Sequence, residues 1–437
     1  MSGKKLWDKG IVTDEFIEKF TVGRDREFDL QLARYDVRGS LAHIKMLATI
    51  GLLEAKELEI LEIELSRILD EIIEPGKFEI EAGVEDVHSQ IELMLVRELG
   101  DVGKKIHSGR SRNDQVLVDL KLFLRNELLE LVSLAKKLFD TLLLRSEEHK
   151  NVLLPGYTHT QAAMPSSFGI WFAAYAESLV DDLVLMQSVH TIVNRNPLGS
   201  AAGYGSSFPL NRSLTTKLLD FDSPAVNVVY AQMGRGKTEQ FFAYGLAGIA
   251  GTLNKLASDV CLYNSQNFKF LKLPDELTTG SSIMPHKKNP DVFELIRAKT
   301  NAILALPNSI SMAISNLTSG YHRDFQILKE LLFPQIQELK TCLEITEYAM
   351  AKVEANEHIL DDSKYDLIFS VEAVNQLVLE GTPFRDAYLL VAKHIEEGSF
   401  EPPKEVKHTH LGSIGNLGNE IIKERMEKLF VTFSGEG

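Results

Sequence analysis

The sequence is poor in cysteine. Cys261 and Cys342 are its only two cysteines among 437 residues. Two cysteines are too few to crosslink a small secreted scaffold, and this number is normal for a protein of the reducing cytosol. The first residues carry alternating charges and lack the apolar core of a secretion signal. We therefore expect a cytoplasmic protein without a disulfide framework.

Long apolar runs and excess positive charge are also missing. No uninterrupted apolar stretch approaches the roughly 20 residues that cross a bilayer. Aspartate and glutamate number 62 against 47 lysines and arginines, a net charge of −15. A field of this sign repels phosphate backbones and anionic lipid surfaces. We expect neither a nucleic acid nor a membrane as partner, although a local basic pocket could still bind a small anion.

Proline is sparse enough to leave wide gaps, with 14 in the chain. A proline inside a helix costs about 3 kcal/mol, so these gaps mark where long helices can run. Residues 115–150 contain no proline or glycine, and their apolar positions recur with the helical period. The same period predicts helices over residues 52–73, 166–194, 238–270, 291–306 and 325–355. Strands have little room in this all-α pattern.

The helical pattern predicts three parts. These are an N-terminal helical domain (1–110), a central bundle of long helices (111–356) and a small C-terminal helical domain (357–437). Several long helices are apolar over more than one face, as the consecutive Leu142, Leu143 and Leu144 illustrate. Such helices are typically buried on several sides, so we expect packing against other subunits. A large monomeric bundle is the alternative.

Polar segments interrupt the predicted helices. The first, residues 107–115, carries Arg110 and Arg112 just before the longest helix, where unpaired N–H groups and the helix dipole favour an anion. The alternative is a plain helix cap at Asp114 with surface arginines. The second, residues 155–161, is expected at a helix entrance and places His159 among hydroxyl and amide donors. A single loop histidine is more often structural than catalytic.

Two further polar segments follow. Residues 278–290 are rich in hydroxyls and include Lys287, Lys288 and Asn289, which could hold carboxylates together with the helix that starts after Pro290. Residues 321–329 could be a helix start. A catalytically silent helical scaffold would leave all four segments unexplained.

One segment indicates a different class of protein. Residues 231–238 approximate the phosphate-binding Walker A loop, with alanine for its first glycine, and residues 226–230 could form the preceding strand. Such a loop needs a parallel sheet, for which this sequence supplies few strands. A turn that opens the next helix is the simpler interpretation, and a P-loop nucleotide-binding protein stays the remote alternative.

Metal binding has little support in the sequence. His88 and Glu92 share a helix face, and His408 and His410 lie two residues apart. No set of three or four ligands is clustered along the chain, and we expect no metal.

Three of the polar segments together resemble the fumarase/aspartase superfamily and, within it, the argininosuccinate lyase family. They are the Ser-Arg-Asn run at 111–113, Gly-Tyr-Thr-His at 156–159 and GSSIMPHKKNP at 280–290, the last similar to the superfamily signature. The similarity runs from Leu6-Trp7 to residues 381–385. The resemblance implies a three-domain fold whose central helices are shared in a homotetramer, with each active site assembled from three subunits. It also implies cleavage of argininosuccinate to arginine and fumarate in arginine biosynthesis, without metal or cofactor.

The resemblance further implies catalytic roles. Ser281 would abstract the proton, from a loop that closes over the substrate. Because a serine hydroxyl is a poor base, Lys287 and loop N–H groups would have to stabilise its alkoxide. His159, paired with Glu294, would assist protonation of the leaving nitrogen or position the substrate.

Substrate-binding residues are implied in the same way. Arg112, Asn113, Thr158 and Asn289 match positions around the succinate part, Tyr321, Gln326 and Lys329 match positions around the other parts, and Asp86 and His88 resemble a further active-site segment. The reaction accumulates negative charge on a carboxylate, which preorganised cations and N–H groups must stabilise. Capture of carboxylates by Arg112 and Lys287 is therefore the physical core of the assignment.

The chain also departs from the family pattern. The family usually has a substrate-binding serine shortly before the first helix, whereas residues 20–29 here contain no serine and are two residues longer. Arg24 or Arg26 could act instead. His286 replaces a glutamine and is more like adenylosuccinate lyase. These changes leave open a substrate acylated on its α-amino group, or another succinylated amine.

Overall fold

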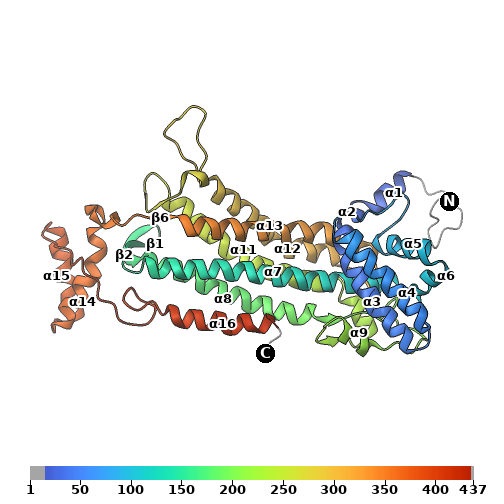
Figure 1. Ribbon diagram of the computed structural model, residues 1–437. Coiled ribbons are helices and arrows are strands. Elements are labelled where there is room, and N and C mark those ends of the chain that lie inside the picture. The colour runs from blue at the N-terminus through green and yellow to red at the C-terminus, as the bar shows by residue number, and fades with distance from the viewer. Residues whose placement is uncertain (1–14, 435–437) are drawn as a thin grey trace. The chain divides into compact units, whose positions relative to one another are not determined.

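The computed structural model describes residues 15–434, so Leu6-Trp7 lies outside the described residues. Within this range the chain is largely helical (Figure 1), and the strands assigned there form three two-stranded sheets. The all-α prediction is confirmed. Among the described helices, none is both long and apolar enough to cross a membrane.

The chain forms two compact units. Unit 1 comprises Met1–Glu130, Leu185–Ala247 and Ala305–Gln337, and unit 2 comprises Leu131–Val184, Gly248–Leu304 and Glu338–Gly437. Five long helices contribute residues to both units: α7 (Arg112–Glu148), α8 (Phe168–Val193), α11 (Lys237–Tyr263), α12 (Asp291–Ile314) and α13 (Ile327–Lys352).

The long helices lie where the apolar period predicts them, with differences at their ends. Helix α11, expected to run to residue 270, ends at Tyr263. Helix α12 was expected to end at Leu306 but continues through Pro307 to Ile314. The proline removes one helical hydrogen bond, at a cost of about 3 kcal/mol. Ile303, Leu306 and Ile310 flank it and are all buried. Burial of these side chains, each worth about 1.5–3 kcal/mol, outweighs that cost.

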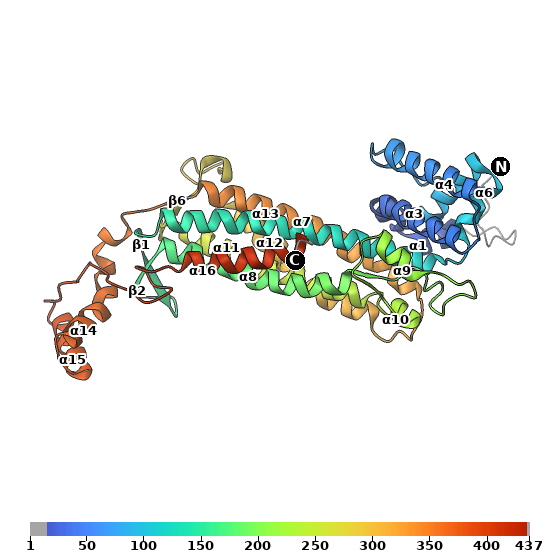
Figure 2. The same cartoon turned by 60° about the horizontal axis from the view of Figure 1, so that its bottom comes forward.

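Unit 1 begins with a group of short helices, which lie side by side in Figures 1 and 2. They are α1 (Glu15–Val22), α2 (Asp25–Asp29), η1 (Leu30–Leu32), α3 (Ala33–Thr49), α4 (Ala55–Arg67), η2 (Ile68–Ile73), α5 (Val87–Leu99), α6 (Asp101–Lys104) and η3 (Lys105–His107). Their core contains Val37, Leu47, Leu61, Leu65 and Ile91, which are all buried. This packing holds the start of α5 against α3.

The rest of unit 1 excludes a P-loop. Its elements are β3 (Arg195–Asn196), α9 (Arg212–Leu218), β4 (Ser223–Pro224), α10 (Val228–Met233) and η5 (Arg323–Gln326). The expectation of a strand before residues 231–238 is wrong, because Val228–Met233 is helical. The Asn227 side chain caps this helix by accepting a hydrogen bond from Tyr230 N at 2.9 Å. Residues 234–236 are the turn that opens α11, as in the simpler interpretation.

Unit 2 contains a hairpin where a helix entrance was expected. Strands β1 (Leu153–Thr158) and β2 (Gln161–Ser167) pair antiparallel and are joined by His159 and Thr160. Both turn residues have positive φ, 50° and 61°. A two-residue turn of this kind is usually built from asparagine and glycine, so His-Thr gives no sequence signal for it.

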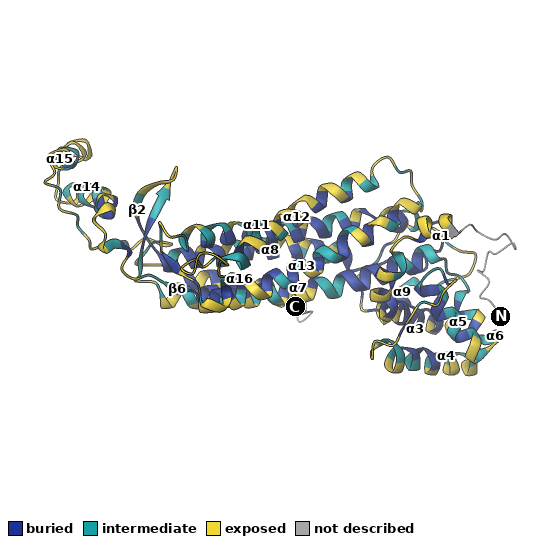
Figure 3. Ribbon diagram, turned by 90° about the horizontal axis from the view of Figure 1, so that it is seen from above, coloured by how far each residue is buried: buried dark blue, intermediate teal, exposed yellow. Residues whose placement is uncertain are grey.

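Smaller elements complete unit 2: β5 (Leu271–Lys272), η4 (Asp275–Leu277), β6 (Glu354–Ala355), η6 (Ile359–Asp361), η7 (Ser363–Phe369), α14 (Ser370–Leu379), α15 (Phe384–Glu396) and α16 (Asn419–Ser434). Helices α14 and α15 pack through Val374, Ala387 and Val391, and α16 lies beside α8, where Arg425 pairs with Glu177 at 2.6 Å. Exposed strips remain on the long helices (Figure 3), and Leu144 of α7 is 60% exposed.

Candidate active site

A cavity of about 310 Å³ in unit 1 brings together seven of the residues singled out in the sequence. They come from the starts of α5 and α7 and from the segment around η5, which are far apart in the chain. The seven are Asp86, His88, Arg112, Asn113, Tyr321, Gln326 and Lys329. All of them were expected to bind substrate.

Asp86 caps helix α5 at one wall of this cavity. Its Oδ1 accepts from the Ser89 N–H at 2.8 Å and from the Ser89 hydroxyl at 2.5 Å. Burial opposes ionisation of this carboxyl, but the charges of His88 and Arg112 and the bonds from Ser89 outweigh it and lower the pKa of Asp86. The cavity therefore keeps a fixed negative charge at the start of α5.

His88 is held by two carboxylates from other helices. Its Nδ1 lies 2.7 Å from Asp36 Oδ1 of α3 and 3.5 Å from Asp119 Oδ2 of α7. Burial alone would lower the pKa of His88, but the charge and hydrogen bond of Asp36 and the charges of Asp119 and Asp86 raise it to about 10. At neutral pH the ring is an imidazolium that lines the cavity.

Asp36, His88 and Asp119 also form a group of three metal-ligating side chains, with ligand atoms within 4.8 Å of one another. No such group is visible in the sequence, because its members lie on α3, α5 and α7. The 2.7 Å contact of His88 with Asp36 is a charge-assisted hydrogen bond. Of these three side chains, His88 lines the cavity.

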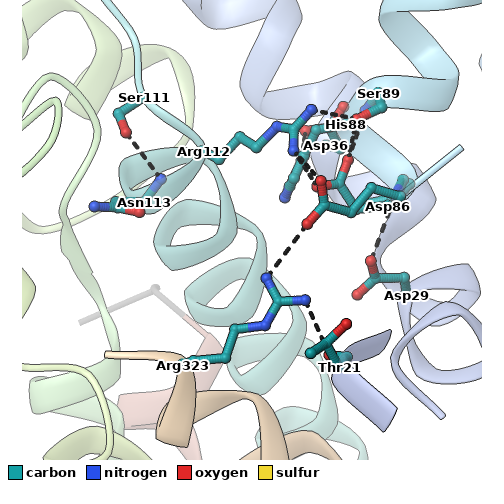
Figure 4. A network of polar contacts seen from close by, with 12 residues as sticks. Thr21, Asp29, Asp36, Asp86, His88, Ser89, Ser111, Arg112, Asn113 and Arg323 are labelled. Carbon is teal, nitrogen blue, oxygen red and sulfur yellow. Dashed lines mark hydrogen bonds and ion pairs between the residues drawn. The ribbon is translucent and has the colours of Figure 1, made fainter. Parts of the chain in front are cut away.

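Arg112, expected to capture a substrate carboxylate, is held by the protein's own acids (Figure 4). Its Nη1 lies 2.9 Å from Glu85 and 3.3 Å from Asp86, and Nη2 donates to the Ser89 hydroxyl at 2.7 Å. Arg323 reaches the same Glu85 at 3.3 Å. A substrate carboxylate would have to share or replace these acidic partners.

Asp114 is the cap that the simpler interpretation of residues 107–115 predicts. Its carboxylate accepts from Ser111 N at 2.9 Å and from Gly199 N and Ala201 N at 3.0 and 2.9 Å. Burial raises the pKa of Asp114 to about 6, against the effect of these N–H groups. Asp114 therefore ties the start of α7 to another loop, while its neighbours Arg112 and Asn113 line the cavity.

Lys329 lies at the buried end of the cavity. Its Nζ lies 2.6 Å from Asp25 and 2.5 Å from Asp29. Burial would lower the pKa of Lys329, but these two carboxylates raise it, so the lysine stays charged. Sequence reasoning missed both aspartates, because an ion pair that spans some three hundred residues leaves no local pattern.

The signature loop of unit 2 is closed at its base. Thr279 and Asn289 exchange two backbone hydrogen bonds of 3.1 and 2.8 Å. Inside the loop, the Ser281 hydroxyl oxygen accepts from the N–H groups of Ile283 and Met284 at 3.4 and 3.2 Å. These are N–H groups of the kind that an alkoxide at Ser281 would need.

A second cavity, of about 780 Å³, lies beside this loop in unit 2. Lys287, Asn289 and Glu294 line it. Thr158 and His159 lie exposed at the tip of the β1–β2 hairpin and line neither cavity. Within the described part of the chain, no hydrogen bond or ion pair joins His159 to Glu294, so this pairing stays a prediction.

The sequence and the fold both match known families. Residues 9–304 match the lyase family, and solved structures share the fold. An EDDS lyase crystallised with formate has a TM-score of 0.74 at 22% identity and covers 98% of this chain and 91% of its own. A class II fumarase from Schistosoma mansoni has a TM-score of 0.70 at 16% identity and covers 95% of each chain. The class is therefore that of the lyases.

Curated relatives narrow the class. An argininosuccinate lyase of Parabacteroides distasonis is 63% identical over 433 residues, which cover 99% of this chain and 97% of the relative. An argininosuccinate lyase of Thermotoga neapolitana is 41% identical over 390 residues, 89% of this chain and 98% of the relative. The chain belongs to the argininosuccinate lyase family.

Proposed function

We propose that this protein cleaves argininosuccinate to L-arginine and fumarate, as a cytoplasmic step of arginine biosynthesis. The match of nearly the whole chain to argininosuccinate lyases is the observation that carries the proposal. The cavity of unit 1 supports it, because its lysine and arginines alternate with carboxylates and suit a substrate that bears both charges.

The reaction begins with removal of a proton from the carbon next to a succinate carboxylate. Ser281 takes this proton, and the electrons of the C–H bond pass first onto the neighbouring carboxylate. The N–H groups of Ile283 and Met284 already point at the Ser281 oxygen. Together with Lys287 they would stabilise the alkoxide that a serine needs to act as a base.

The electron pair then returns to form the double bond of fumarate, and the bond between carbon and the guanidinium nitrogen breaks. That nitrogen takes up a proton as arginine leaves. We assign the assistance of this step to His159, oriented by Glu294. Arg112, Asn113, Thr158 and Asn289 would hold the succinate carboxylates and spread the charge of the intermediate, while Tyr321, Gln326, Lys329, Asp86 and His88 would surround the rest of the substrate.

We further propose that the enzyme is a homotetramer whose sites combine residues of different subunits. Ser281 and His159 lie on loops of unit 2 whose tips are exposed, whereas seven of the nine proposed binding residues line the cavity of unit 1. Large apolar side chains such as Leu144 and Met312 are more than half exposed on long helices. Contact with other subunits would bury them.

The test is release of fumarate by the purified protein, followed as ultraviolet absorbance. Argininosuccinate is compared with adenylosuccinate at equal concentration, and each assay is repeated after dialysis against a chelator. We expect turnover of argininosuccinate at least about 100-fold faster than of adenylosuccinate, unchanged by the chelator. The reverse preference, or no fumarate from either compound, would refute the proposal.

A further inference from the structure

Two arginines of the unit 1 cavity bind the same carboxylate. Arg112 Nη1 lies 2.9 Å from Glu85 Oε2, and Arg323 Nη1 lies 3.3 Å from Glu85 Oε1. All three side chains line the cavity, and the two arginines reach it from α7 and from η5 (Figure 4). Two guanidinium groups that meet both oxygens of one carboxylate form a carboxylate-binding site. Its occupant is a residue of the protein itself.

Each arginine also has an anchor that does not depend on Glu85. Arg112 Nη2 donates to the Ser89 hydroxyl at 2.7 Å, and Arg323 Nη2 donates to the Thr21 carbonyl oxygen at 2.9 Å. These bonds use the other terminal nitrogen of each guanidinium group. Both Nη1 atoms would therefore stay in place if Glu85 withdrew, and the site would remain formed for another carboxylate.

Glu85 is free to leave in a way that its neighbour Asp86 is not. Asp86 also lies 3.3 Å from Arg112 Nη1, but its Oδ1 accepts from the N–H and the hydroxyl of Ser89 as the cap of α5. Within the part of the chain that the structure describes, the Glu85 carboxylate bonds to the two arginines alone. Residues 81–83 beside it are exposed. Rotation about the side-chain bonds of Glu85 can carry its carboxylate towards this solvent without movement of the backbone.

The charges favour exchange of carboxylates over addition of one. The two guanidinium groups balance the carboxylates of Glu85 and Asp86, so an added substrate carboxylate would leave an uncompensated negative charge in a partly buried place. We propose that Glu85 occupies a carboxylate subsite between Arg112 and Arg323, and that a carboxylate of the substrate's succinate part displaces it. This inference rests on the proposed function, and it makes Arg323 a further substrate-binding residue.

Displacement of Glu85 has a consequence for affinity. A site that is open only while its resident carboxylate is turned away binds any ligand more weakly, by the fraction of time for which it is open. The same competition acts on fumarate, which keeps both carboxylates of the succinate part after cleavage. Return of Glu85 to the two arginines would therefore promote release of this product.

The experiment measures binding of succinate to the full-length enzyme by calorimetry, because this dicarboxylate binds without reacting. Glu85→Gln removes the competing charge, and Glu85→Asp keeps the charge but draws the carboxylate back by one carbon. Glu81→Gln is the matched control, since Glu81 lies on the same segment and binds Arg97 at 2.8 Å but does not line the cavity. We expect the Kd for succinate to fall at least about 5-fold in both Glu85 variants and to stay unchanged in the control. Arg323→Gln, added to Glu85→Gln, should abolish the gain.

The other outcomes would overturn the proposal. Unchanged or weaker binding by Glu85→Gln would mean that Glu85 only holds the arginines in place. A gain in Glu85→Gln without one in Glu85→Asp, or an equal gain in Glu81→Gln, would mean that overall charge acts and not occupation of the subsite. A gain that survives Arg323→Gln would place the subsite elsewhere.

The proposed function is judged separately, by fumarate release from argininosuccinate by the wild type. If no fumarate appears, that function fails whatever the succinate affinities are. If fumarate appears but neither Glu85 variant binds succinate more tightly, the role of Glu85 is refuted while the function stands. Thermal unfolding of each variant confirms that the compared enzymes are folded.

Discussion

Ser281, the base proposed for this reaction, depends on its immediate surroundings. A serine hydroxyl loses its proton only with difficulty, and two backbone N–H groups approach its oxygen within the signature loop. These donors remain when the side chain is shortened, so the loop should keep its conformation in a variant without the hydroxyl.

We therefore expect Ser281→Ala to lower kcat by about 10³-fold or more and to change substrate affinity little. Steady-state kinetics and equilibrium binding of argininosuccinate by calorimetry measure the two effects. Ser282→Ala, one residue along the same loop, is the control and should keep most of the activity. If Ser282→Ala is the inactive variant, the base has been assigned to the wrong serine.

His88 should make unit 1 less stable as the pH becomes alkaline. An unperturbed histidine has a pKa of about 6.5, whereas His88 in the fold has a pKa of about 10. The folded state thus binds this proton more tightly than the unfolded state does. The resulting stabilisation is complete below pH 6.5 and is lost as the pH rises towards 10.

Comparison of wild type with His88→Gln isolates this effect. Between pH 6 and pH 10 we expect the wild type to lose at least roughly 2 kcal/mol more unfolding free energy than the variant. Urea unfolding at fixed protein concentration measures it. Parallel losses in the two proteins would show that Asp36 and Asp119 do not hold a protonated ring.

At the residue scale, sequence reasoning picked out residues that the fold brings together but did not find their charged partners. Seven expected residues line one cavity, because the family motifs that mark them are local runs of sequence. Their charged partners Asp25, Asp36 and Asp119 were missed. An ion pair depends on which helices pack together, and no spacing along one segment records that.

At the scale of elements, the start of α7 depends on Asp114. This one carboxylate accepts hydrogen bonds from three backbone N–H groups. Two of these groups belong to the separate segment at Gly199 and Ala201. Hydrogen bonds to a charged acceptor are each worth about 1.5–3 kcal/mol, and their loss leaves buried donors without partners.

Asp114→Ala should therefore destabilise the protein by roughly 3 kcal/mol or more. Asp140→Ala is a fair control, because Asp140 lies on the same helix but is exposed and pairs, among the described residues, with Lys136 at 2.7 Å. Urea unfolding of both variants should show a large loss for the first and less than about 0.5 kcal/mol for the second. Equal losses would mean that Asp114 is merely a surface cap.

The helices themselves were predictable and their interruptions less so. Proline gaps and apolar periods gave the long helices, but the rule that proline ends a helix failed at Pro307, where flanking burial outweighs the local cost. The β1–β2 hairpin was missed because its turn is made by His159 and Thr160 in place of the usual asparagine and glycine. Tertiary packing decides both cases.

For the whole molecule, the proposed division of each active site among subunits has a direct test. Ser281→Ala and Arg112→Gln should each be inactive, because each removes one part of every site. Tetramers assembled from both chains would contain some sites with both parts intact.

We expect the mixed sample, after dissociation and reassembly together, to be at least about 10-fold more active than either variant alone. Size-exclusion chromatography with light scattering should give four times the mass of one chain. Chains of each variant that are dissociated and reassembled separately provide the control. Failure of the mixture to regain activity, with tetramers present, would place both residues in the site of a single subunit.

The backbone bridge between Thr279 and Asn289 also limits how the signature loop can travel. A segment held at both ends moves most at its middle and least beside the two ends. Ser281 and Lys287 each lie two residues from the bridge, whereas Ile283, whose side chain is 82% exposed, lies nearer the middle of the loop. If Ser281 and Lys287 carry the proposed chemistry, a movement of the loop about this bridge would displace them less than the apolar residues at its middle, and release of product would not separate the proposed reacting groups.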